Sequence, residues 1–462
     1  MSRRTSLVRR IARLMARVFG AVTDAVLRAG RKLRAHPMRG ISVLTICLAF
    51  VLLVMTSTLP IALAPLAPEL ALMLSPNNPD ALLAKANRIR ADALATMDQT
   101  EKSDSGSDAW RDEVKAIAWR VIAVDPLNAA AYMLLADTAT DPAQRLDFLR
   151  EAMRRSRRQS EATLALLQES AKNGNFSALI NYGDILLRTR PEIGTSILAV
   201  LTPLAEIPEA RPALIEWIIR SPSWRTAFFQ QLNTTVTAAD TPAELMQALT
   251  ERGDPPSTKE VDQYVSAILA WKLPDYAYDF WLQSLPVEML GAIDLLNDAA
   301  FERAPGAGPF DWRMATGANA IGEFIPLPDV AQGRVFHAVF GGGRVQFPQI
   351  SQTLVLAPGR YELSSRARGS VIGKRGLSWE IACLYGKQAT IGQSEPLLGR
   401  LTNWTDRTFQ FEVPDTPDCA AQMLRFYHDA RFTSEQLVQG EIWLAGPTLK
   451  RLDDPPQTEA SP

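Results

Sequence analysis

The stretch Arg360–Ala367, RYELSSRA, decides the fold of the C-terminal third of the chain, because its apolar residues recur at every second position. Tyr361 and Leu363 fall on one face of an extended strand, whereas Glu362 and Arg366 fall on the other. Side chains of a β-strand alternate between its two faces. This period therefore predicts a strand with one buried and one solvent-facing side.

The same period of two recurs in neighbouring stretches of the sequence. They are Trp379-x-Ile381-x-Cys383, Phe409-x-Phe411-x-Val413 and Leu424-x-Phe426. Turns rich in Gly and Pro begin at Phe301–Pro309 (FERAPGAGP) and separate about eight short strands. We therefore predict an all-β sandwich over residues 301–452, followed by a disordered tail over residues 453–462.

Helical patterning fills residues 67–300. Signals that end one helix and open the next recur at intervals of 33 and 32 residues, at Asp125–Asn128, Arg158–Glu161 and Arg190–Glu192, and the turn Gly174-Asn175-Phe176 lies between two of them. This spacing resembles the tetratricopeptide repeat family over about residues 76–200, in which each helix pair buries its apolar face on its neighbours. An all-α solenoid is the expectation, and an irregular helical bundle is the alternative.

A membrane anchor is predicted near the N-terminus. Residues 41–64 hold 24 positions without a charge, and about 20 apolar residues cross a bilayer as a helix. We assign residues 41–66 as an uncleaved signal anchor, because the small-x-small site at Ala62–Ala64 is followed by Pro65. A cleaved signal peptide is the alternative.

Charge is divided unevenly along the chain and orients this anchor. Residues 1–40 contain ten Arg and one Lys against the single acid Asp24, whereas the remainder has 38 basic and 49 acidic residues. Lys- and Arg-rich flanks stay in the cytoplasm, so the body is expected in the periplasm. Residues 1–40 are predicted to form an amphipathic segment on anionic lipids, with a disordered flank as the alternative, and no nucleic acid is expected to bind. Its membrane-surface residues are Arg9, Arg10, Arg13 and Arg17.

The predicted orientation determines the redox environment of the cysteines. Cys47 lies in the predicted span, while Cys383 and Cys419 both lie in the β-region and, by orientation, in an oxidising compartment. A disulfide between Cys383 and Cys419 is the expectation.

The motifs of catalysis and metal binding are missing from the sequence. His36, His337 and His428 are far apart, and no metalloprotease His-Glu pair or nucleophile elbow occurs. The stretch Gly369–Arg375 is similar to a phosphate loop but lacks one residue between its glycines, so a hairpin loop explains it better. We expect no enzyme activity, no cofactor and no metal.

The order of motifs in the β-region resembles jelly-roll carbohydrate-binding modules over residues 309–452. In that family an apolar-Pro-Gly turn enters a strand, a Trp precedes a strand that ends in Val-Pro, and a Gly-x-Ile-Trp strand closes the fold. The corresponding motifs here are Leu356–Leu363, Arg366–Gly369, Trp404 with Phe409–Pro414, and Gly440–Trp443. The resemblance implies a jelly-roll sandwich, with glycan binding as one of several roles of such modules.

Sugar recognition needs aromatic faces for stacking and polar groups that bond hydroxyls or uronates. The candidate glycan-binding residues are Arg366, Arg368, Tyr385, His428 and Arg431. The alternative for the Arg residues is a solvated strand face. The tryptophans of this region are interpreted as core residues: Trp312, Trp379, Trp404 and Trp443.

Helical repeats on a membrane anchor, joined to such a module, resemble accessory proteins of bacterial exopolysaccharide or capsule synthesis and export. The resemblance implies a periplasmic scaffold that binds protein partners of the export complex through its helices and polysaccharide through its sandwich. A scaffold for a secretion or division machine is the alternative, and a polysaccharide-modifying enzyme is the third hypothesis.

Overall fold

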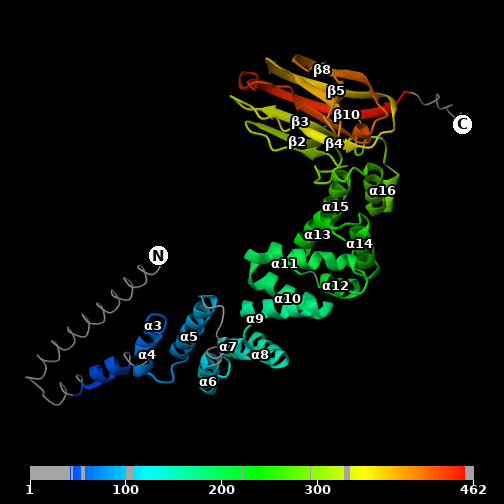
Figure 1. Ribbon diagram of the computed structural model, residues 1–462. Helices are drawn as coiled ribbons and strands as arrows, with labels where there is room; N and C mark the ends of the chain where they lie inside the picture. The colour runs from blue at the N-terminus through cyan, green and yellow to red at the C-terminus, as the bar shows by residue number, and fades with distance from the viewer. Residues whose placement is uncertain are drawn as a thin grey trace, which may run out of the picture. The chain divides into compact units, whose positions relative to one another are not determined.

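The computed structural model describes residues 42, 45–53, 58–99, 109–220, 222–291, 293–326 and 333–452. The chain divides after Pro191 into two compact units, the first α-helical and the second containing helices followed by strands (Figure 1). The predicted basic segment 1–40 and the predicted tail 453–462 lie outside the described residues.

The first unit is built from helices that contact their neighbours in sequence. Short turns join them, and asparagine or aspartate side chains cap several helix starts: Asn128 accepts from the Ala131 amide and Asn175 from the Ala178 amide. The helices are α3 (Leu59–Leu63), α4 (Pro68–Leu74), α5 (Pro79–Gln99), α6 (Ala109–Val124), α7 (Ala129–Thr138), α8 (Pro142–Arg155), α9 (Ser160–Lys172) and α10 (Phe176–Thr189).

Each predicted helix-ending signal lies at a helix boundary. Asp125–Asn128 separates α6 from α7, and Gly174, with a φ of +63°, turns the chain between α9 and α10. The helical character of this region is confirmed. Membership of the tetratricopeptide family is not.

Within the described residues, none of the helices combines the length and the apolar character needed to cross a membrane. The predicted span 41–66 is only partly described, since residues 41, 43–44 and 54–57 lie outside the description. The last helix within this span is α3. Ala64, which follows α3, is buried together with Ala71 from α4 and Ala81 from α5.

The second unit begins with helices and short 3₁₀ turns. Its capping is exemplified by Ser257, which accepts from the Glu260 amide while the Glu260 carboxylate accepts from the Ser257 amide. The elements are η1 (Pro191–Ile193) at the boundary, α11 (Gly194–Leu201), η2 (Thr202–Glu206), α12 (Arg211–Ile218), α13 (Arg225–Thr235), α14 (Thr241–Glu251), α15 (Thr258–Ala270), α16 (Pro274–Ser284) and α17 (Val287–Leu290).

In the described residues 293–326 and 333–452, two antiparallel sheets of five strands follow, which confirms the predicted β-sandwich. Sheet I has the order β1-β4-β9-β6-β7. Sheet II has the order β2-β3-β10-β5-β8, which can be followed in Figure 1. The strands are β1 (Arg313–Met314), β2 (Ala320–Pro326), β3 (Arg334–Phe340), β4 (Ile350–Leu354), β5 (Gly359–Gly373), β6 (Leu377–Cys383), β7 (Thr390–Gln393), β8 (Gly399–Val413), β9 (Gln422–His428) and β10 (Val438–Arg451).

The sandwich core lies between the two sheets and contains the predicted alternating residues. Tyr361 and Leu363 from β5 meet Trp379 and Phe426 from sheet I in one buried cluster. Leu296 and Phe301, which precede the first strand, are buried in the same cluster. The core of the sandwich thus includes side chains from the segment that leads into it.

Cys383 at the end of β6 and Cys419 in η3 (Pro417–Cys419) form a disulfide, with Cα atoms 4.4 Å apart. It links the end of β6 to the connection between β8 and β9.

Candidate functional site

The outer face of sheet II carries a row of large polar and aromatic side chains. In β10, Ile442 and Leu444 point into the core, so Trp443 between them points outward. Trp443 lies opposite His337 of β3 on one side and opposite Arg368 of β5 on the other. The pairing of three strands thus places these three side chains side by side.

The geometry of this row is tight. The imidazole of His337 stacks on the Trp443 indole with ring centroids 4.6 Å apart and an interplanar angle of 14°. The Arg368 guanidinium carbon lies 5.4 Å from the Trp443 ring centroid and 5.0 Å from that of Trp404 on β8. We call His337, Trp443, Arg368 and Trp404 the tryptophan–arginine row.

A local irregularity of the sheet brings Trp404 to Arg368. The register between β5 and β8 shifts between Ala367 and Gly369, so Arg368 has no directly opposed residue on β8. Trp404 fills that place and packs with Trp443 over the buried Val335 and Ala445. Trp404 and Trp443 are half-buried on the outer face, so their interpretation as core residues is wrong, whereas Trp312 and Trp379 are core residues as predicted.

Charges are distributed unevenly along the row. His337 Nδ1 is 3.7 Å from a Glu323 carboxylate oxygen, and His337 Nε2 is 3.4 Å from one of Glu441. At the other end, none of the described residues forms an ion pair with Arg368. The guanidinium therefore lies between two indoles without an ion-pair partner among the described residues, and cation–π attraction holds it over their faces.

The remaining predicted glycan-binding residues do not join this row as a group. Arg366 shares the outer face of β5 and lies opposite Asp406 of β8. Tyr385 is buried, with 9% of its surface exposed, so its ring is not offered to a ligand. Its hydroxyl has no hydrogen-bond partner among the described residues. Burial and the nearby Asp275 raise the pKa of Tyr385 to about 12. The prediction of Tyr385 as a stacking surface is thus wrong.

His428 and Arg431 lie together at one end of the sandwich, in a cluster of charged loop residues. His428 Nε2 is 3.3 Å from the Arg375 carbonyl oxygen, and Arg431 Nε is 3.8 Å from an Asp429 carboxylate oxygen. Arg375 Nε in turn lies 3.3 Å from a Glu435 carboxylate oxygen. These charges are paired within the cluster.

The outer face of sheet I holds a second polar cluster, which the sequence analysis missed. Arg425 of β9 donates to the Glu380 carboxylate of β6 at 2.8 Å, and its guanidinium lies 4.5 Å from the Tyr427 ring centroid. Gln393 donates to the Tyr427 hydroxyl at 3.1 Å. Burial and the Glu380 carboxylate raise the pKa of Tyr427 above its ordinary value. This cluster satisfies its own charges.

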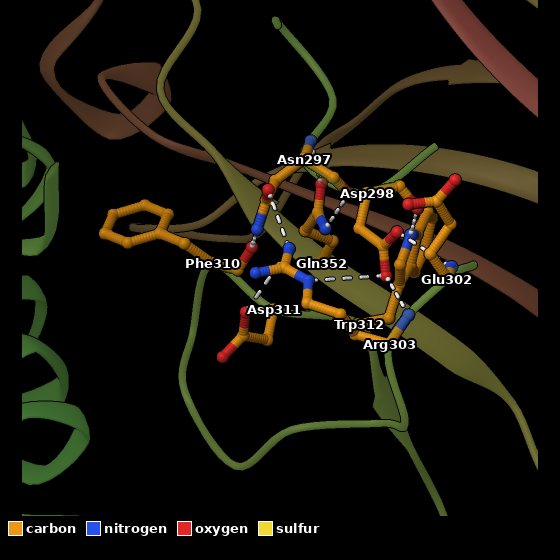
Figure 2. Close-up of polar contacts among 8 residues, drawn as sticks. All are labelled: Asn297, Asp298, Glu302, Arg303, Phe310, Asp311, Trp312 and Gln352. Carbon is orange, nitrogen blue, oxygen red and sulfur yellow. Dashed lines mark hydrogen bonds and ion pairs between the residues drawn. The ribbon is translucent and has the colours of Figure 1, made fainter. Parts of the chain in front are cut away.

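A third polar network fixes the segment through which the chain enters the sandwich (Figure 2). Asn297 and Gln352 exchange two hydrogen bonds, from the Asn297 amide to Gln352 Oε1 at 3.0 Å and from Gln352 Nε2 to the Asn297 carbonyl at 2.9 Å. Arg303 donates to Asn297 Oδ1 at 2.8 Å. Trp312 Nε1 donates to the Asp298 carbonyl at 3.0 Å. Every polar group named here has a partner, so the network is structural.

No family model matches the chain, and none of the curated proteins matches it. Among solved structures, a putative sugar-binding protein from Bacteroides thetaiotaomicron is 10% identical, with 34% of this chain and 100% of that chain covered and a TM-score of 0.27. A "Family 16 Carbohydrate Binding Module-2" is 13% identical over 34% and 100% of the chains, with a TM-score of 0.24. TmCBM61 in complex with β-1,4-galactotriose is 13% identical over 30% and 88%, with a TM-score of 0.21. TM-scores this low carry no argument about this chain.

Proposed function

We propose that this protein is a membrane-anchored periplasmic scaffold of exopolysaccharide or capsular polysaccharide synthesis or export, which binds the polymer through its sandwich and protein partners through its helices. The observation that carries the proposal is the tryptophan–arginine row. Two indole faces flank a guanidinium whose five N–H groups have no carboxylate partner among the described residues. Such a site offers what a sugar ring needs.

The chemistry of the row suits a saccharide. Pyranose rings present C–H faces that pack on indoles, while their hydroxyl or carboxylate oxygens accept hydrogen bonds from a planar guanidinium. Cation–π contact pre-orders Arg368, so less side-chain entropy is lost when a ligand binds. A single exposed row supports dissociation constants of about 10⁻⁵–10⁻³ M, and repeated engagement along a polymer raises the retention.

The anchor is the second part of the proposal. The uncharged stretch 41–64 and its basic flank support a single span with a cytoplasmic N-terminus. A reporter that functions only in the periplasm, fused after residue 70, should be active. Activity of a cytoplasmic reporter at the same junction would contradict the orientation.

Affinity retention of the full chain on the host's own polysaccharide tests the sandwich. The wild type should be retarded on the immobilised polymer, whereas Trp443→Ala and Trp404→Ala should each weaken binding at least ~10-fold, because each removes one stacking face. Phe432→Ala is the matched control, since Phe432 is an aromatic residue that is 69% exposed in another part of the sandwich. Its retention should equal that of the wild type.

Two results together would defeat the glycan proposal. One is a wild-type chain that passes the polymer column unretarded. The other is a deletion strain that secretes normal amounts of polysaccharide. The scaffold would then serve another envelope machine, with the sandwich as a protein-binding module.

A further inference from the structure

Helix α4 directly follows the predicted span and is fixed to the helices after it. Ala64, the last residue of the uncharged stretch, is buried in one apolar cluster with Ala71 of α4 and Ala81 of α5. Arg88 Nη1 of α5 also donates to Glu69 Oε1 of α4 at 3.1 Å. The end of the predicted span is thus packed against the first unit, and an ion pair ties α4 to α5.

A second face of α4 is apolar and exposed. Leu70, Met73 and Leu74 lie three and four residues apart, a spacing that places them on one side of a helix. They are 54%, 79% and 45% exposed, and Leu66 in the preceding turn is 51% exposed. A helix face that meets water normally carries polar residues, so a contiguous apolar face indicates an interaction surface.

The charges around α4 favour lipid as the partner. Glu69 is the only charged residue between positions 41 and 79, and its carboxylate is already paired with Arg88. A protein interface usually combines an apolar centre with a polar rim that forms hydrogen bonds. Acyl chains need no polar partner, so an apolar face without available charges suits them better.

The length of the connection fixes how far α4 can lie from the predicted span. Three residues separate Ala64 from Pro68, and four extended steps of the chain cover at most about 14 Å. The connection is in fact folded, because the amides of Leu66 and Ala67 both donate to the Leu63 carbonyl. If the chain up to Ala64 is in the bilayer, α4 has to lie at the bilayer surface.

We propose that the exposed face of α4 is a membrane-docking surface, which lies along the periplasmic leaflet with Leu70, Met73 and Leu74 among the acyl chains. The three side chains reach the same depth when the helix axis runs along the surface, as in interfacial helices. The first unit is thereby seated on the membrane instead of hanging from the span. This inference rests on the anchor of the proposed function and is independent of its glycan site.

Spin labelling of the full chain in vesicles of phosphatidylethanolamine and phosphatidylglycerol tests the docking surface. Met73→Cys and Leu70→Cys, each in a Cys47→Ala chain, receive one nitroxide, since the other two cysteines are bonded to each other. Molecular oxygen dissolves among acyl chains, whereas a nickel chelate stays in water. Both labels should show a ratio of oxygen to nickel collisions several-fold above that of Ala143→Cys, the matched control at an exposed position of α8.

The outcomes separate the docking surface from the anchor on which it rests. If alkaline carbonate extracts the full chain from the vesicles, the anchor is wrong and the docking surface fails with it. If the chain stays in the membrane but either label is as accessible to nickel as the control, α4 lies in water and the docking surface alone is overturned. Labels shielded from both oxygen and nickel would show that protein, such as a second copy of the chain, covers α4 in place of lipid, and would also overturn it.

Discussion

Arg368 and Arg425 each lie on the outer face of one sheet of the sandwich, and each lies over an aromatic ring. They differ in whether a carboxylate pairs with the guanidinium. Arg425 donates to Glu380 at 2.8 Å, and the Glu380 side chain is only 8% exposed. Arg368 lies between Trp404 and Trp443, and no described residue forms an ion pair with it. An arginine whose partner is buried beside it stabilises the fold, whereas one without a partner is available to a ligand.

If this comparison is correct, changes around Arg425 should cost stability and leave ligand binding intact, and changes around Arg368 should do the reverse.

Removal of the disulfide should have the largest effect on the free energy of unfolding. One of its cysteines, Cys383, lies three residues after Glu380 on β6. Cys383→Ser combined with Cys419→Ser should lower the free energy of unfolding by about 3–4 kcal/mol on the chain-entropy model, because the bridge closes a loop of 36 residues. Denaturant unfolding of the two proteins measures this, and retention on polysaccharide should stay unchanged under native conditions. Two free thiols in non-reduced peptides of the wild type would refute the bridge.

Glu380→Gln should have the second largest effect on the free energy of unfolding. It leaves the Arg425 guanidinium without its charged partner at a site where Glu380 is buried, so the free energy of unfolding should fall by about 2 kcal/mol. Glu441→Gln, on the outer face of sheet II with a side chain that is 46% exposed, is the matched control and should cost less than about 0.5 kcal/mol. Equal costs for the two variants would argue against the comparison.

Acidification should weaken the end of β9, the strand that carries Arg425. Burial lowers the pKa of His428 below its ordinary value of 6.5, although the Arg375 carbonyl, Asp429 and Glu435 oppose the shift. The unfolded chain therefore takes up this proton more readily, and the free energy of unfolding should fall as the pH drops through about 6.5. His428→Gln should flatten the pH dependence between pH 5 and 8 in urea titrations. An unchanged slope would exclude His428 as its source.

Arg368→Gln should cost less stability than Glu380→Gln. A half-exposed cation over two indoles contributes about 0.5–1 kcal/mol, so unfolding should change by no more than that, while polysaccharide retention should fall sharply. Arg425→Gln is the opposite case, because it leaves buried Glu380 unpaired and should cost more stability with retention intact. A loss of retention in Arg425→Gln, but not in Arg368→Gln, would transfer the candidate site to sheet I.

The sequence predicted the strands of the sandwich because alternation is a local property. Tyr361 and Leu363 are buried, and Arg366 and Arg368 lie on the other face, as their positions require. The same rule applied to Ile442 and Leu444 would have placed Trp443 outside the core. The interpretation of Trp404 and Trp443 as core residues departs from this rule and is wrong for that reason.

Other features depend on pairing that no local pattern contains. Arg425 meets Glu380 only because β9 pairs with β6 in one register, and Asn297 meets Gln352 across 55 residues of sequence. Asn233 looks like an ordinary polar residue on α13 until the packing of that helix buries it, with 5% of its surface exposed. Such contacts follow from tertiary structure and were missed.

The network around Asn297 also bears on where this protein can be cut. The segment 297–312 between α17 and β1 has no regular helix or strand, and its Gly- and Pro-rich sequence has the character of a linker. Yet the amide hydrogens of Asn297, Glu302 and Arg303 are donated to side chains of Gln352 and Asp298. Such amides exchange with solvent only when the network opens, so this irregular segment should resist deuterium exchange and proteases as a strand does.

A fragment that starts at residue 305 would discard Leu296 and Phe301 from the core, together with all three of these hydrogen bonds. The point near residues 301–309 where the residue pattern changes from helical to strand-like is therefore a poor place to divide the protein.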